Sequence, residues 1–147
     1  MEIGNVNVAT DSGHLMPHLL AIRNFAAEFA VESMIDFGCG TADLYQDGVY
    51  VSHCEHIKDY WDVQDITLYD PNHTKYSTLP NKPADMVVCT NVLCQLTHEE
   101  QVKALVQINK LSTKCVYISV GASAEGCQWW CKFIAKYMTK PFLLFTG

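Results

Sequence analysis

The stretch Ser33-Met34-Ile35-Asp36-Phe37-Gly38-Cys39-Gly40 decides the fold of this chain. It begins as a short, mostly apolar run and stops at two closely spaced glycines, as a buried parallel strand does before a tight turn. We therefore expect a strand over 33–37 followed directly by a glycine turn. Glycine takes backbone angles that a β-carbon penalises, and it lets the main chain approach a ligand closely.

Strands and helices alternate on both sides of this turn. Apolar residues recur with a helical period over 14–30, and the mixed pattern of 42–60 predicts a further helix, interrupted near Gly48. Thr97-His98-Glu99-Glu100 fits a capping box, so a helix should begin there and bury Val106 among other residues. The same reasoning predicts a helix around 130–137 and strands over 66–69, 86–90, 116–120 and 142–145.

This alternation predicts a single α/β domain over 1–147. Near-continuously apolar strands imply a mostly parallel, Rossmann-like sheet with helices on both faces. Ligands of such sheets lie beyond the carboxyl ends of the strands. Residues 38–42, 70–72 and 90–95 all fall on that rim, which makes it the predicted site.

Composition narrows the classes of partner. The net charge is −6, and the lysines and arginines form no cluster that could neutralise a run of phosphates, so a nucleic-acid partner is not favoured. The sequence has neither signal-peptide blocks nor an apolar run long enough to cross a membrane, so we expect a cytoplasmic protein. Seven cysteines without a Cys-x-x-Cys pair suggest reduced thiols, and the pair His14 and His18 lacks a second cluster, so no metal is expected.

Three segments resemble the motifs of class I S-adenosylmethionine-dependent methyltransferases. Residues 34–42, MIDFGCGTA, look like the family's first motif; residues 66–70, ITLYD, are similar to the strand that ends in the ribose-binding acid. Residues 84–93, ADMVVCTNVL, resemble the family's third motif. The runs Leu-Tyr-Asp-Pro at 68–71 and Tyr-Ser-Thr-Leu-Pro at 76–80 also resemble segments of short methyltransferase-like proteins that are common in bacteriophage genomes. For a protein of that kind, the expected location is the cytoplasm of the host.

The resemblance implies a reduced class I methyltransferase fold and a set of cofactor contacts. Asp36 would help to bind the methionyl ammonium, partly through water, and Asp70 would accept hydrogen bonds from both ribose hydroxyls. Free amides of the turn would hold polar ligand groups. The implied cofactor-binding residues are Asp36, Phe37, Gly38, Cys39, Gly40, Asp70, Pro71, Asn72, Thr90 and Asn91.

The chain departs from the family where a general base is common. Relatives often show Asp-Val-Leu-Glu-His there, whereas this chain has Asn91-Val92-Leu93-Cys94-Gln95. Asn91 and His98 are the remaining catalytic candidates. Only about ten residues separate Asp70 from Pro80, where full-size relatives fit a helix and a further strand, so one wall of the pocket should be thin.

Three functions remain open from the sequence. The first is methyl transfer to a small-molecule or protein acceptor, and the second is a module that binds S-adenosylmethionine without transferring its methyl group. The third is a dinucleotide-binding oxidoreductase, but the third glycine of that fingerprint falls on Asp43, and the expected acid stands thirty residues after Gly40 rather than about twenty.

The C-terminal strand predicts association. Residues 142–145 form an apolar strand after Pro141 with no hairpin partner, and an unpaired sheet edge invites pairing with another chain. We expect a homodimer, or a partner protein, through the region 129–145. The alternative is a monomer in which residues 1–12 cover this edge.

Overall fold

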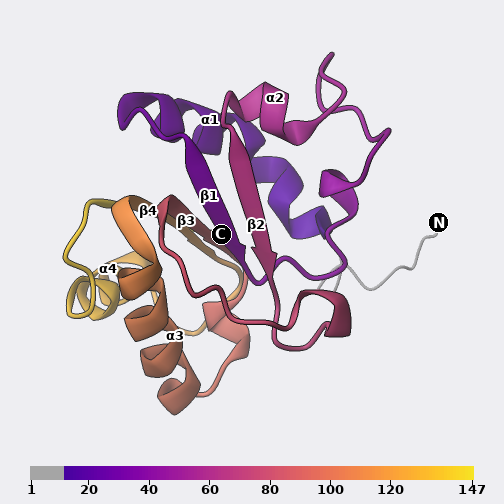
Figure 1. The fold of residues 1–147 in the computed structure, drawn as a ribbon. Helices are drawn as coiled ribbons and strands as arrows, with labels where there is room; N and C mark the ends of the chain where they lie inside the picture. Colours follow the sequence, from indigo (N-terminus) through magenta and orange to yellow (C-terminus); the bar gives the residue numbers. More distant parts are fainter. Residues whose placement is uncertain (1–11) are drawn as a thin grey trace.

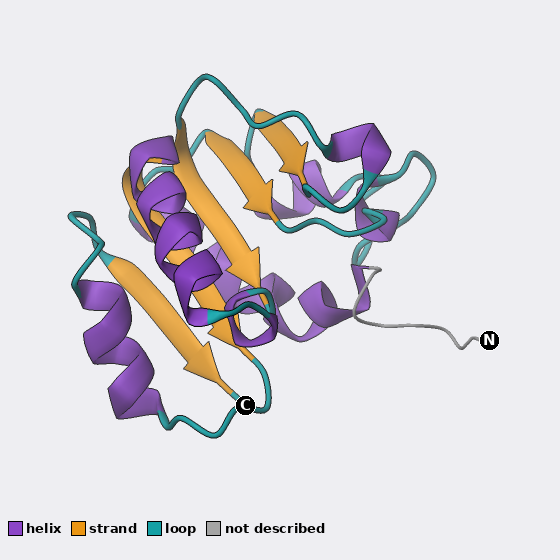
Figure 2. Ribbon diagram, turned by 90° about the horizontal axis from the view of Figure 1, so that it is seen from below, coloured by secondary structure: helices purple, strands orange, loops and turns teal. Residues whose placement is uncertain are grey.

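The computed structural model describes residues 12–147, with side chains from residue 14 onward. Its centre is a five-stranded sheet in the order β2-β1-β3-β4-β5, and every neighbouring pair is parallel. All the strand arrows in Figure 2 accordingly point the same way. The strands are β1 Ser33–Phe37, β2 Asp65–Tyr69, β3 Ala84–Thr90, β4 Ser112–Val120 and β5 Phe142–Thr146.

Helices cover both faces of the sheet, which confirms the predicted α/β class with a Rossmann-like arrangement (Figure 1). Successive side chains of a strand point to opposite faces. Met34 packs with the face that carries α1 Leu19–Glu28 and α2 Ile57–Trp61, whereas Ile35 packs with α3 His98–Leu111 and α4 Cys127–Ala135. The central strands are therefore buried on both sides.

The N-terminal helix differs from the prediction in its first part. It begins as a 3₁₀ helix, η2 Ser12–His18, and becomes α-helical only from Leu19. Pro17 lies in η2, and proline disfavours the α conformation of the residue before it. The α-helical part packs Ile22 and Phe25 against the sheet, whereas Leu20 is 57% exposed.

The helix predicted over 42–60 is wrong for most of its length. The chain forms the short 3₁₀ helix η3 Asp43–Tyr45, a loop with an isolated bridge between Val51 and Cys54, and then the five-residue α2. Gly48 has a φ of +82°, which is outside the helical region. The apolar residues of this segment reach the core from separate short elements rather than from one helix face.

The capping box at the start of α3 is confirmed. The Thr97 hydroxyl accepts a hydrogen bond from the Glu100 amide (3.2 Å), and the Glu100 carboxylate accepts one from the Thr97 amide (2.9 Å). The helix buries Ala104, Leu105, Ile108 and Leu111, which lie on one helical stripe. Val106 falls off that stripe and is 40% exposed, so its predicted burial is wrong.

β5 lies at one edge of the sheet, as predicted, and β2 lies at the other. Between β2 and β3 the chain forms only the 3₁₀ helix η4 Thr74–Tyr76 and loops. The alternative in which residues 1–12 cover β5 concerns a segment that lies outside the described residues, apart from its last one. No described helix combines the length and the apolar character that a membrane crossing requires.

Candidate functional site

The glycine turn after β1 is fastened to the end of β2. The amides of Gly38 and Cys39 both donate to the Tyr69 carbonyl, at 2.7 and 3.1 Å, and the Gly40 amide donates to Oδ2 of Asp70 at 2.9 Å. Gly38 and Gly40 have φ values of +99° and +60°, which favour glycine. The two predicted motifs are thus one hydrogen-bonded unit.

These bonds correct the expectation that the turn offers free amides. The amides of Gly38, Cys39 and Gly40 already have acceptors within the chain. Gly38 is also closed to a side chain, because a β-carbon there would stand 2.3 Å from Cγ2 of Val92. The absence of a side chain at Gly38 therefore makes room for the Val92 side chain, and the need for glycine here does not by itself indicate a ligand.

Asp70 retains acceptor capacity after it has fastened the turn. Oδ2 accepts from the Gly40 amide and Oδ1 from the Asn72 amide, each at 2.9 Å. A carboxylate oxygen can accept about two hydrogen bonds, so each oxygen keeps roughly one acceptor position. Asp70 is half-buried and lines a cavity, so these positions are within reach of a ligand.

That cavity has a volume of about 420 Å³ and lies at the carboxyl ends of β1, β2 and β3. Most of the predicted cofactor residues line it, namely Phe37, Gly38, Asp70, Pro71, Asn72, Thr90 and Asn91. Asp36, Cys39 and Gly40 are buried and do not line it. The rim inferred from the strand ends is therefore a cavity, and three of the predicted residues are not part of its lining.

Asp36 is the charged residue among these three, and it is 3% exposed. The Tyr45 hydroxyl donates to its Oδ2 at 2.5 Å, whereas Oδ1 is buried with no hydrogen-bond partner among the described residues. Burial raises the pKa of Asp36 to about 7; the nearby charge of Asp70 adds to this increase, and the hydrogen bond from Tyr45 opposes it. Asp36 therefore needs a donor or a positive charge to be held ionised at neutral pH.

Further buried polar side chains stand at the carboxyl ends of the central strands. Among the described residues the buried polar side chains are those of Asp36, Thr90, Ser119 and Ser112, and the first three stand at or near the carboxyl ends of adjacent strands. The hydroxyl oxygens of Thr90 and Thr41 are buried without a partner in the described chain. Such groups are uncommon in native proteins and indicate a place for water or a ligand.

The two catalytic candidates have different positions. Asn91 lines the cavity in a left-handed conformation, with a φ of +57°, and its Oδ1 accepts from the Cys94 thiol at 3.2 Å. A neutral amide can orient a substrate but is not a base. His98 is the first residue of α3, and its ring packs against Phe133 with centroids 5.3 Å apart. It does not line the cavity.

Tyr45 and several cavity residues were not expected from the sequence. His14, Tyr69, Lys103 and Gln107 line the cavity together with the predicted set. His14 was considered only as half of a metal pair with His18, but Nδ1 of His18 lies 2.7 Å from the Tyr117 hydroxyl. In the part of the chain that the structure describes, no three acidic, histidine or cysteine side chains gather as a metal site.

The fold and the cavity together define an α/β protein with an all-parallel sheet and a cavity of mixed polar and apolar lining at its carboxyl edge. No protein-family model, no curated protein and no solved structure matches the chain. The function is therefore argued from the site itself.

Proposed function

We propose that the chain binds S-adenosylmethionine at this cavity and transfers its methyl group to a small-molecule or protein acceptor. One observation carries the proposal: Asp36 and Asp70 stand at the glycine turn, close enough for the charge of Asp70 to raise the pKa of Asp36, and one buried oxygen of Asp36 has no partner among the described residues. A site of this charge suits a ligand that is positive near the turn and carries hydroxyl donors beside it. S-adenosylmethionine has an ammonium, a sulfonium and a ribose diol.

The residues present fit that cofactor. The free acceptor positions of Asp70 suit the two ribose hydroxyls, and Pro71 and Asn72, which also line the cavity, can flank the adenine. Asp36 would act on the ammonium only through water, because it does not line the cavity. Bound S-adenosylmethionine supplies an electrophilic methyl group; the chain supplies binding, orientation and exclusion of water.

A dinucleotide fits less well. Its pyrophosphate is held by free amides at a turn and at the start of a helix. In this chain the amides of Gly38, Cys39 and Gly40 are engaged, and the turn leads into the three-residue η3 instead of an α-helix. Asp36 and Asp70 would also repel a pyrophosphate. These contacts support the preference for a cationic ligand over NAD.

Binding without transfer is the second candidate, and the catalytic positions favour it. Asn91 is a neutral amide, and His98 lies outside the cavity. The Glu100 carboxylate, which does line the cavity, is occupied by the capping box, and its hydrogen bonds with Thr97 lower its pKa. If none of these three residues acts as a general base, methyl transfer would proceed only to an acceptor that needs no base, such as an amine or thiolate already deprotonated in solution.

Two measurements test these alternatives. Titration calorimetry with S-adenosylmethionine, S-adenosylhomocysteine and NAD should show binding of the first two and not of NAD; the reverse would refute the proposed cofactor. Incubation of the purified chain with labelled S-adenosylmethionine and a cell extract should then label an acceptor. Binding without any labelling would support the module that does not transfer. The cytoplasmic location stays a prediction.

A further inference from the structure

The outer edge of β2 is open along its length. Within residues 12–147, β2 pairs with β1 alone. The Asp65 amide donates to Glu32, and the Tyr69 carbonyl accepts from Gly38, so both residues turn their backbone groups toward β1. Alternate residues of a parallel strand face the same neighbour. Thr67 therefore also faces β1, whereas Ile66 and Leu68 present their backbone groups outward.

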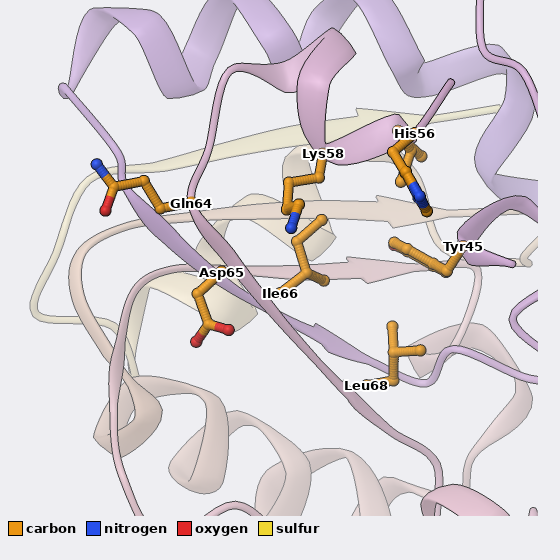
Figure 3. A pocket seen from close by; sticks show the side chains of 8 residues that line it. Tyr45, His56, Lys58, Gln64, Asp65, Ile66 and Leu68 are labelled. Atoms are coloured by element: carbon orange, nitrogen blue, oxygen red, sulfur yellow. The ribbon is translucent and has the colours of Figure 1, made fainter. Parts of the chain in front are cut away.

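Hollows flank this edge on both faces of the sheet. On the α2 face, a hollow of about 240 Å³ is lined by residues that include Lys58, Ile66 and Leu68. Figure 3 shows Lys58 and Ile66 reaching toward each other there, whereas the Asp65 carboxylate points away from α2. On the opposite face, a hollow of about 330 Å³ is lined by Thr67, Leu68, Lys75, Tyr76 and residues 78–81. An added strand would thus find space for side chains on either side.

We propose that this edge pairs with β2 of a second copy of the chain, antiparallel and about a twofold axis at Thr67. In this register Ile66 of each copy stands opposite Leu68 of the other, and their outward backbone groups form the hydrogen-bonded pairs. The register is self-complementary, as a twofold interface requires. It uses every outward backbone group between Asp65 and Tyr69.

The side chains on both faces agree with this register. On the α2 face, Ile66 and Leu68 form apolar cross-strand pairs, which the aliphatic part of Lys58 can cover. On the other face, Asp65 of one copy lies beside Tyr69 of the second copy, next to the hollow that contains Lys75. Lys75 lies over the Tyr76 ring and forms no ion pair with any residue that the structure describes. The negative charge of Asp65 in each copy therefore lies near the positive charge of Lys75 in the other copy, and the twofold axis produces this attractive pair twice.

The edge at β5 is less suited to such pairing. Near the end of β5, the Phe145 ring already contacts His18 and Tyr117, with centroids 5.7 and 5.6 Å apart. Proline and lysine commonly protect an edge strand, and neither occurs within β2 or β5, so the packed Phe145 ring is what distinguishes the two edges.

A charge swap tests the proposal without touching the backbone. Light scattering over a range of concentrations should show self-association of the natural chain. K75E and D65K should each raise the dimer dissociation constant by roughly tenfold or more, because two attractive charge pairs become repulsive. The double variant D65K/K75E should restore most of the affinity. K132E changes the net charge as K75E does, but on α4 near β5, and should have no such effect.

Hydrogen exchange supplies the second readout. The amides of Ile66 and Leu68 should exchange more slowly at concentrations where the dimer forms than in dilute solution. A monomer at every concentration would overturn the proposal, even if these amides were protected, because the cover would then come from the same chain. A dimer weakened by K132E but not by K75E would also overturn it and place the interface at β5.

Discussion

Asp70 combines two tasks in one side chain, since it fastens the glycine turn and faces the cavity. We predict that Asp70→Ala weakens the binding of S-adenosylhomocysteine by about 1.5–3 kcal/mol, the range for hydrogen bonds to a charged group. Calorimetry measures this change. The same variant should melt at a lower temperature, because the amides of Gly40 and Asn72 lose their acceptor.

The matched control for Asp70 is Asp65→Ala, which removes an exposed carboxylate from the other end of the same strand. It should leave the affinity for S-adenosylhomocysteine unchanged. If Asp70→Ala lowered only the melting temperature and bound ligand as before, Asp70 would serve the turn alone, and the ribose assignment would fail.

Gly38 gives a second prediction at this scale. Because a branched side chain at Gly38 would occupy space that a ligand needs, the sequence alone predicts that Gly38→Val abolishes binding and leaves a folded chain. The structure instead predicts a loss of stability, because the β-carbon would lie 2.3 Å from Val92 and the φ of +99° strains any other residue. Thermal melting of Gly38→Ala should show a lower midpoint, which Val92→Ala restores only in part because the strain remains. Full restoration would show that packing alone is at issue.

Single residues could be predicted from the sequence where they belong to a strand end. Asp70 follows β2 directly and Gly38 follows β1, so strand periodicity was enough to place both at one rim. Tyr45 was not predicted, because it reaches Asp36 from the short η3 after the turn. No periodic pattern gives the direction of a side chain in such a segment.

Among the helices and strands, the capping box at the start of α3 makes a contribution to stability that can be measured directly. Thr97→Ala removes the acceptor for the Glu100 amide and should cost about 1 kcal/mol of stability. This corresponds to a fall of roughly 2–4 °C in the melting temperature for a chain of this size. Thr78→Ala, in the exposed segment before β3, is the control and should change the midpoint little. Equal shifts in both variants would mean that the cap adds nothing.

The elements that were predicted well have one strong periodic signal each. The strands are short apolar runs, and α3 and α4 repeat apolar residues on one stripe. The segment 42–60 has no single period, since Val51, Ile57 and Trp61 are buried from a bridge and a short helix. Their burial depends on contacts with α1 that local sequence does not encode.

For the whole molecule, Asp36 makes stability depend on pH. Its pKa rises from 3.8 to about 7 on folding, so between these values the folded chain binds more protons than the unfolded chain. Stability contributed by this group therefore falls as the pH rises through that window. We predict that Asp36→Asn melts several degrees above the natural chain when the pH exceeds about 7, and that the gain shrinks steadily as the pH is lowered toward 3.8.

Thermal melts at a series of pH values test this prediction, with Asp65→Asn as the control at an exposed carboxylate. A pH-independent difference between Asp36→Asn and the natural chain would show that Asp36 is ionised in the fold at all these values.

The dimer expected through residues 129–145 also concerns the whole molecule and stays a prediction. The K132E variant described for the β2 edge tests it, because Lys132 lies on α4 near β5.

The hydrogen bond from Gly40 to Asp70 joins residues thirty positions apart, and β1 is bordered by β2 and β3, both of which follow it in the chain. During synthesis, the glycine turn therefore emerges before any of its partners exists. A ligand has nothing to bind until β2 and β3 have been made and have taken their places on either side of β1. It follows that a ligand of this cavity cannot start folding; it acts on the finished molecule and lengthens its lifetime by slowing unfolding.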